Sequence, residues 1–110
     1  MTRETIFSDG TFTLLKQVNE NESKTYSFLE VLCNDADVNK YGITIDVMKN
    51  PFSDNTYNDY MVWIRYDKVD SKFGSISDTK RKIEILQQAV IFAERIESYI
   101  EESGFSVERR

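Results

Sequence analysis

The amino-acid sequence predicts an α+β fold, in which a four- or five-stranded antiparallel sheet is followed by one long C-terminal helix packed on one face. Two periodicities carry this prediction. Apolar and polar residues alternate at 43–49, as they do along a half-buried strand. From Ser77 onward apolar residues recur at helical spacing instead, with a period of about 3.6. Strands followed by a helix favour an antiparallel sheet with the helix across it.

Four strands are predicted, and the first two come from the N-terminal third of the chain. The first is expected at about 5–18, with Asp9-Gly10 as a tight turn near its start, because glycine tolerates a positive φ. The second is expected at about 25–33, where β-branched and aromatic residues are frequent. These two segments are expected to form a meander.

The third and fourth strands are predicted at 43–49 and at about 60–69, on either side of a polar loop. In the fourth, Val62 and Ile64 are expected to face the core, and Met61, Trp63 and Arg65 the opposite side. The side chains on that opposite side are large, and they would leave much surface area exposed if this face were in contact with water.

A single helix is predicted at about 78–103. Ser77 or Asp78 can cap its start. At its end Gly104 stands where a left-handed residue is needed, and Phe105 is placed to contact Ile100, as in a Schellman ending.

The apolar arc of this helix is wider than one sheet face would cover. A second stripe at seven-residue spacing lies beside the first and consists of Ile85, Phe92 and Tyr99. A second copy of the chain is one candidate to cover it, because homodimers are the commonest soluble oligomers; these three residues are the predicted dimer interface. The alternatives are that the sheet curls around the helix, or that Ile6 and Phe7 fold over it.

Composition indicates one globular domain, residues 1–110. The chain has 40% hydrophobic and 30% charged residues, and no linker or repeat interrupts it. It shows no apolar run long enough for a signal peptide or a membrane span. The single cysteine, Cys33, suits a reducing compartment. The expected location is therefore the cytoplasm of a host cell or of a phage-infected cell.

The residues that usually carry catalysis are missing. The chain has no histidine and one cysteine, which removes the common general base and the common zinc ligands. The segment from Asp35 to Asp46 resembles a calcium loop in its acid spacing, but Lys40 stands where the loop needs glycine. We therefore expect no enzyme activity, no metal and no cofactor.

The net charge of −5 is concentrated in one part of the chain, because residues 19–59 contain eight acids and three bases. An acidic field repels nucleic acid and membranes and attracts basic surfaces. The loop at 50–59 mixes aromatic residues with Ser, Asn and Asp, a composition typical of binding loops; alternatively, its aromatic residues pack beneath the loop. The predicted partner-binding residues are Asp35, Asp37, Tyr41, Phe52, Asp54, Tyr57, Asp59 and Trp63.

The charges of the predicted helix run against its dipole. Three bases stand in the first turn and three acids, Glu97, Glu101 and Glu102, in the last two, which is locally unfavourable. A basic first turn with free backbone N–H groups suits an anion, although a solvated charged end explains the same residues. The alternative anion-binding set is Arg65, Lys80, Arg81 and Lys82.

These features predict a small acidic, non-catalytic protein-binding module with another protein as its partner. We expect an inhibitor of a basic, nucleic-acid-handling protein, because phage and mobile-element anti-defence proteins, including inhibitors of CRISPR nucleases, share this size, acidity and lack of catalytic groups. The alternatives are a toxin immunity protein and a homo-oligomeric binder of a small anionic ligand. No direct contact with nucleic acid or membrane is expected.

Overall fold

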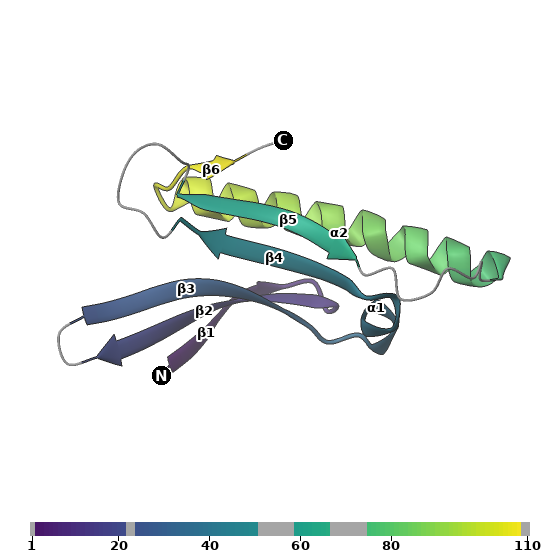
Figure 1. The fold of residues 1–110 in the computed structure, drawn as a ribbon, viewed down its shortest axis with the longest axis horizontal. Helices are drawn as coiled ribbons and strands as arrows, with labels where there is room; N and C mark the ends of the chain where they lie inside the picture. Colours follow the sequence, from purple (N-terminus) through teal and green to yellow (C-terminus); the bar gives the residue numbers. More distant parts are fainter. Residues whose placement is uncertain (1, 22–23, 51–58, 67–74, 109–110) are drawn as a thin grey trace.

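A long C-terminal helix, α2 (Ile76–Glu102), lies along two small β-sheets (Figure 1). The computed structural model describes residues 2–21, 24–50, 59–66 and 75–108. The molecule is elongated, 53 × 30 × 24 Å, because the 27 residues of α2 rise about 40 Å at ~1.5 Å per residue. Within the described ranges, no helix combines the length and apolar character needed to cross a membrane.

The first sheet is an antiparallel meander of β1 (Thr2–Ser8), β2 (Phe12–Asn21) and β3 (Lys24–Cys33). The strand predicted at 5–18 is therefore two strands. The Asp9 carboxylate accepts hydrogen bonds from the backbone N–H groups of Thr11 and Phe12 at 2.9 and 2.7 Å, and Gly10 has a φ of +93°. The predicted tight turn thus reverses the chain, and the residues before it become β1.

The second sheet consists of β4 (Ile43–Lys49), β5 (Tyr60–Tyr66) and β6 (Val107–Glu108). β4 and β5 pair antiparallel along their full length, from Ile43 opposite Tyr66 to Lys49 opposite Tyr60. β6 pairs parallel to the first two residues of β5 only. The last part of the predicted fourth strand, 67–69, lies outside the described residues.

Two elements of the structure were not predicted from the sequence. A short helix, α1 (Ala36–Tyr41), stands where we expected a polar loop, and it buries Val38 completely. Its six residues are too few for a helical period to show. β6 has two residues, and its pairing with β5 depends on the fold rather than on any local pattern.

The α+β class and the long C-terminal helix are confirmed, but the prediction of a single four- or five-stranded sheet is wrong. In the part of the chain that the structure describes, each sheet has three strands. β3 and β4 lie side by side in Figure 1 without joining into one sheet, and α1 connects them. The alternation of apolar and polar residues along a strand indicates which side chains face the core, but it does not indicate which strands pair with each other.

Both ends of α2 are capped as helix ends usually are, but the N-terminal cap lies earlier in the sequence than predicted. Ser75 is the N-cap, and its hydroxyl accepts from the Asp78 N–H at 3.1 Å, so the helix begins two residues before the predicted start. At the other end Phe105 N–H donates to the Ile100 carbonyl and Gly104 N–H to that of Glu101. These two bonds form the predicted Schellman ending.

Gly104 provides a direct stability test of this ending. Its φ is +90° and no atom lies within 4 Å of an added Cβ, so a substitution there introduces backbone strain without a clash. We expect Gly104→Ala to lower the free energy of unfolding by about 1 kcal/mol, measured by urea denaturation. Glu102→Ala, at an exposed helical position, is the control. Equal stability of Gly104→Ala and this control would contradict the assignment.

The second apolar stripe of α2 is covered by the chain itself. Ile85 and Phe92 are 0% and 1% exposed. The ring of Phe7 contacts those of Phe92 and Tyr99, with centroids 5.3 and 6.1 Å apart, and Phe12 lies 5.5 Å from Phe92. The predicted dimer interface of Ile85, Phe92 and Tyr99 is thus packed within one chain, because the first sheet folds its N-terminal strand over the helix.

Candidate functional site

A groove of about 770 Å³ opens between β5 and the C-terminal half of α2. This size lies within the range of ligand-binding clefts, roughly 300–1,000 Å³. One side is formed by four consecutive residues of β5, 61–64, and the other by glutamates of α2 and β6. The glutamates are Glu94, Glu97 and Glu108.

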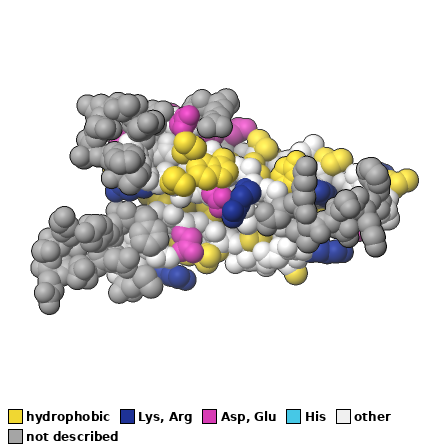
Figure 2. All heavy atoms as spheres, in the orientation of Figure 1, with side chains coloured by type: hydrophobic (Ala, Val, Ile, Leu, Met, Phe, Trp, Pro, Cys, Tyr) yellow, Lys and Arg dark blue, Asp and Glu magenta, His cyan; other side chains and the backbone are white. Residues whose placement is uncertain are grey.

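The alternation of β5 places its side chains as the sequence predicted. Val62 and Ile64 pack against the core, so Met61 and Trp63 lie on the outer face. There Trp63 stands opposite Asp46, and Met61 opposite the exposed Met48. Figure 2 shows hydrophobic side chains gathered over β5, with acidic and basic side chains beside them. Trp63 is half-buried and offers a large apolar contact at the groove.

Within the described ranges, the backbone of β5 is paired along the whole of one edge and along only part of the other. β4 pairs with all seven residues, whereas β6 reaches only Tyr60 and Met61. Among the described residues, no strand pairs with 62–66 on this second edge. An unpaired edge presents backbone N–H and C=O groups in the pattern that an added strand requires.

All charged side chains in the described lining of the groove are negative. Its described lining includes three carboxylates and no base. Glu94 is exposed, and Glu97 and Glu108 are half-buried. Two of these acids lie in the C-terminal half of α2, where the helix dipole is also negative, and the last turn has no base. The groove therefore combines an apolar floor, an open strand edge and a negative wall.

The comparisons with known proteins found no relative of this chain. No protein-family model, no curated protein and no solved structure matches the chain.

Among the predicted partner-binding residues that the structure describes, Asp59 lies apart from Asp35 and Tyr41. Asp35 and Tyr41 contact residues near the start of α2: Asp35 forms an ion pair with Arg81 at 3.5 Å, and the Tyr41 hydroxyl donates to a carboxylate oxygen of Asp78 at 3.5 Å. Asp37 belongs to α1, beside them in the chain. Asp59 is at the opposite end of the β4–β5 hairpin, about 20 Å away for strands of seven residues at ~3.3 Å each.

Asp59 has a structural partner. Its carboxylate accepts hydrogen bonds from the backbone N–H and the hydroxyl of Ser106, at 2.9 and 3.1 Å. Its own backbone N–H donates to the Ser106 hydroxyl at 2.9 Å. These bonds attach the segment before β6 to the start of β5. The loop residues Phe52, Asp54 and Tyr57 lie outside the described residues, whereas Trp63 lies in the groove.

Three of the four alternative anion-binding residues contact other side chains. Asp78 is the charged residue of the first turn, because the helix begins at Ile76, so the bases follow one turn later. Arg81 contacts Asp35 and Glu84, and Lys82 lies over the Tyr66 ring at 5.4 Å. Arg65 pairs with Asp46 at 3.3 Å. Lys80 is exposed. In the described part of the chain, no group of three or more potential metal ligands is present.

Sequence reasoning missed Glu94 and Glu108 as members of a site. The signal that pointed toward this wall was the acidic C-terminal half of the helix, which contradicts the dipole rule. That signal does not identify which glutamates face β5, and Glu108 reaches the groove only because β6 pairs there.

Proposed function

We propose that the protein is a non-catalytic binding module that docks on a basic, extended segment of another protein through the groove between β5 and α2. By occupying such a segment it would inhibit a basic, nucleic-acid-handling protein, as anti-defence proteins do. The observation that carries the proposal is an edge of β5 that no described strand covers at 62–66, beside a wall of glutamates.

Strand addition explains how the backbone of a partner is held. An extended peptide can pair with a free sheet edge through main-chain hydrogen bonds, while alternate side chains enter flanking pockets. Residues 62–66 continue this edge beyond its pairing with β6, and alternate residues among them direct their N–H and C=O groups outward. A segment of about the same length fits this edge.

Charge and aromatic area explain why the partner is basic. Lysine or arginine on the added strand would face Glu94, Glu97 and Glu108, and complementary charge speeds encounter and selects against acidic partners. Trp63 supplies the kind of buried aromatic contact that dominates interface energies. The acids thus favour recognition, and the tryptophan slows dissociation.

The test uses a fluorescently labelled nine-residue peptide of alternating lysine and valine, with fluorescence anisotropy as the readout. We expect it to bind, and we expect binding to weaken with salt as the Debye length shortens to ~8 Å at physiological ionic strength. Glu94→Lys and Trp63→Ala should each raise Kd about tenfold, which corresponds to ~1.4 kcal/mol. Glu102→Lys is the matched control, since Glu102 is an exposed glutamate of the same helix that does not line the groove.

Two further peptides separate the components of the proposal. A peptide with glutamate in place of lysine should not bind, because it meets the wall with like charge. A lysine–valine peptide with N-methylated alternate amides should bind more weakly, because it cannot complete the strand pairing. Equal affinities of Glu94→Lys, Trp63→Ala and Glu102→Lys for the basic peptide would refute the groove as the docking site.

A further inference from the structure

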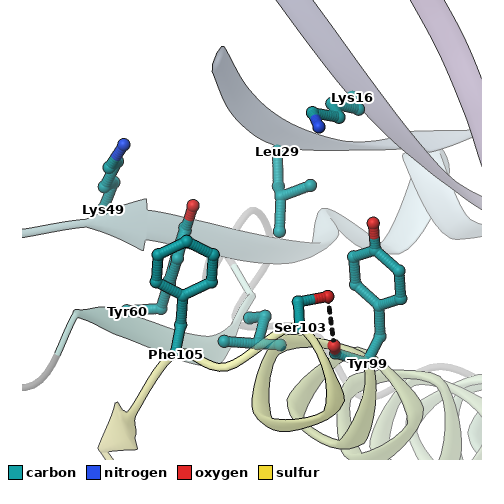
Figure 3. Close-up of a pocket in the computed structure, with 8 residues that line it drawn as sticks. Lys16, Leu29, Lys49, Tyr60, Tyr99, Ser103 and Phe105 are labelled. Carbon is teal, nitrogen blue, oxygen red and sulfur yellow. Dashed lines mark hydrogen bonds between the residues drawn. The ribbon is translucent and has the colours of Figure 1, made fainter. Parts of the chain in front are cut away.

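A small cavity of about 140 Å³ lies where both sheets meet the C-terminal end of α2. In Figure 3 the hydroxyl groups of Tyr60 and Tyr99 and the amino groups of Lys16 and Lys49 lie toward one side of it, and Phe105 and the end of the helix lie toward the other. The described lining of this cavity shares no residue with that of the groove.

The polar side of this cavity consists of hydrogen-bond donors. Its described lining contains no carboxylate. Lys16 is half-buried and Lys49 exposed, and within the described residues neither ammonium group nor the Tyr99 hydroxyl has a hydrogen bond or ion pair. The Ser103 hydroxyl already donates to the Tyr99 carbonyl at 2.8 Å. Two lysines and a tyrosine thus line a space in which the described residues place no anion.

Tyr60 contributes a protonated hydroxyl. Burial, and after it the charge of Asp59 and the proximity of Tyr99, raise the pKa of Tyr60 above the ordinary tyrosine value. It therefore stays neutral and able to donate well above neutral pH. Asp59, the acid that contributes to this pKa, directs its carboxylate to Ser106 rather than into the cavity.

The remaining lining is apolar. Leu29, Ile100 and Phe105 form it, and Ile100 is fully buried. An apolar protein cavity of about 150 Å³ holds one benzene molecule, so this space admits a body of about six carbon atoms. A purely inorganic anion would leave the apolar part unfilled.

We propose that this cavity binds a small monocarboxylate with an apolar body the size of a benzene ring or a branched alkyl chain. The apolar body lies among Leu29, Ile100 and Phe105, and the carboxylate faces Lys16 and Lys49 with the Tyr99 hydroxyl beside it. Charge-assisted hydrogen bonds from the lysines supply orientation. For a ligand of this size we expect a Kd of about 1 mM.

Isothermal titration calorimetry with benzoate tests the site, and nitrogen–proton NMR spectra locate it. Benzoate should bind at millimolar concentration and shift the amide signals of residues 99–106 and 60. Lys16→Gln combined with Lys49→Gln should raise the Kd about tenfold, whereas Lys80→Gln, an exposed lysine of α2 outside the cavity, should leave it unchanged. Circular dichroism and urea denaturation establish that each variant is folded.

The chemistry of the ligand is tested separately. Benzyl alcohol lacks the charge and inorganic phosphate lacks the apolar body, so each should bind at least tenfold more weakly than benzoate. The proposal is overturned if benzoate does not bind, if the lysine double variant binds it as well as Lys80→Gln does, or if benzyl alcohol or phosphate matches it. None of these outcomes bears on peptide binding in the groove.

Discussion

Replacing Phe92 with alanine is expected to lower the free energy of unfolding by about 3–5 kcal/mol, the usual range for a buried phenylalanine. The ring is 1% exposed and contacts Phe7 and Phe12 at centroid distances of 5.3 and 5.5 Å. It is the point at which α2 packs against both β1 and β2. The loss therefore combines a cavity in the core with weaker attachment of the first sheet.

Urea denaturation measures this effect, and Ile91→Ala is the matched control. Ile91 is the neighbouring residue on the same helix and is 68% exposed, so its truncation should change stability by no more than about 0.5 kcal/mol. Light scattering on the same samples tests the dimer predicted from the sequence. A Phe92→Ala protein with unchanged stability but half the mass of the wild type would show that this ring belongs to an interface between chains, against the packing described.

Replacing Asp59 with alanine is expected to lower the free energy of unfolding by about 1–2 kcal/mol, because hydrogen bonds to a charged group carry more than neutral ones. The carboxylate accepts two hydrogen bonds from Ser106, and the backbone of Ser106 in turn accepts from Tyr60 N–H at 3.0 Å. Loss of the carboxylate should release the segment that leads into β6.

Hydrogen exchange identifies this local effect. The Tyr60 amide should exchange faster in Asp59→Ala than in the wild type, while amides in the middle of α2 change only as much as global stability does. Glu84→Ala is the control, since it removes an exposed carboxylate that pairs with Arg81 and such pairs contribute little. If the Tyr60 amide is equally protected in both variants, the Asp59–Ser106 contact does not hold β6.

Local signals in the sequence were sufficient to predict several features of the fold. The glycine at 104 marks the end of α2, since a left-handed residue is needed there and the structure gives it a φ of +90°. Asp9-Gly10 marks a turn for the same reason. The alternation in β5 identifies Val62 and Ile64 as core-facing and leaves Trp63 outside. Each of these signals depends on the backbone preferences or side-chain directions of a few adjacent residues.

The candidate site was predictable only in part. Trp63 was named from the alternation of β5, but its association with Glu94, Glu97 and Glu108 depends on where α2 and β6 lie. Conversely, Asp35 was predicted to attract a basic partner and Arg81 to attract an anion. The fold brings these two residues together as an ion pair, a contact that neither sequence pattern indicated.

What the sequence by itself determined was the class of the fold, the long helix and the direction that side chains face along it and along the strands. Only the tertiary structure decided that the strands divide into two sheets and that Phe7 covers Phe92. It also decided that an edge of β5 stays open, within the described residues, beside acids from α2 and β6. Periodicity and capping act over a few residues along the chain. Which strands pair, and which residues cover the helix, depend instead on contacts between segments tens of residues apart. The packing of the whole core determines these contacts.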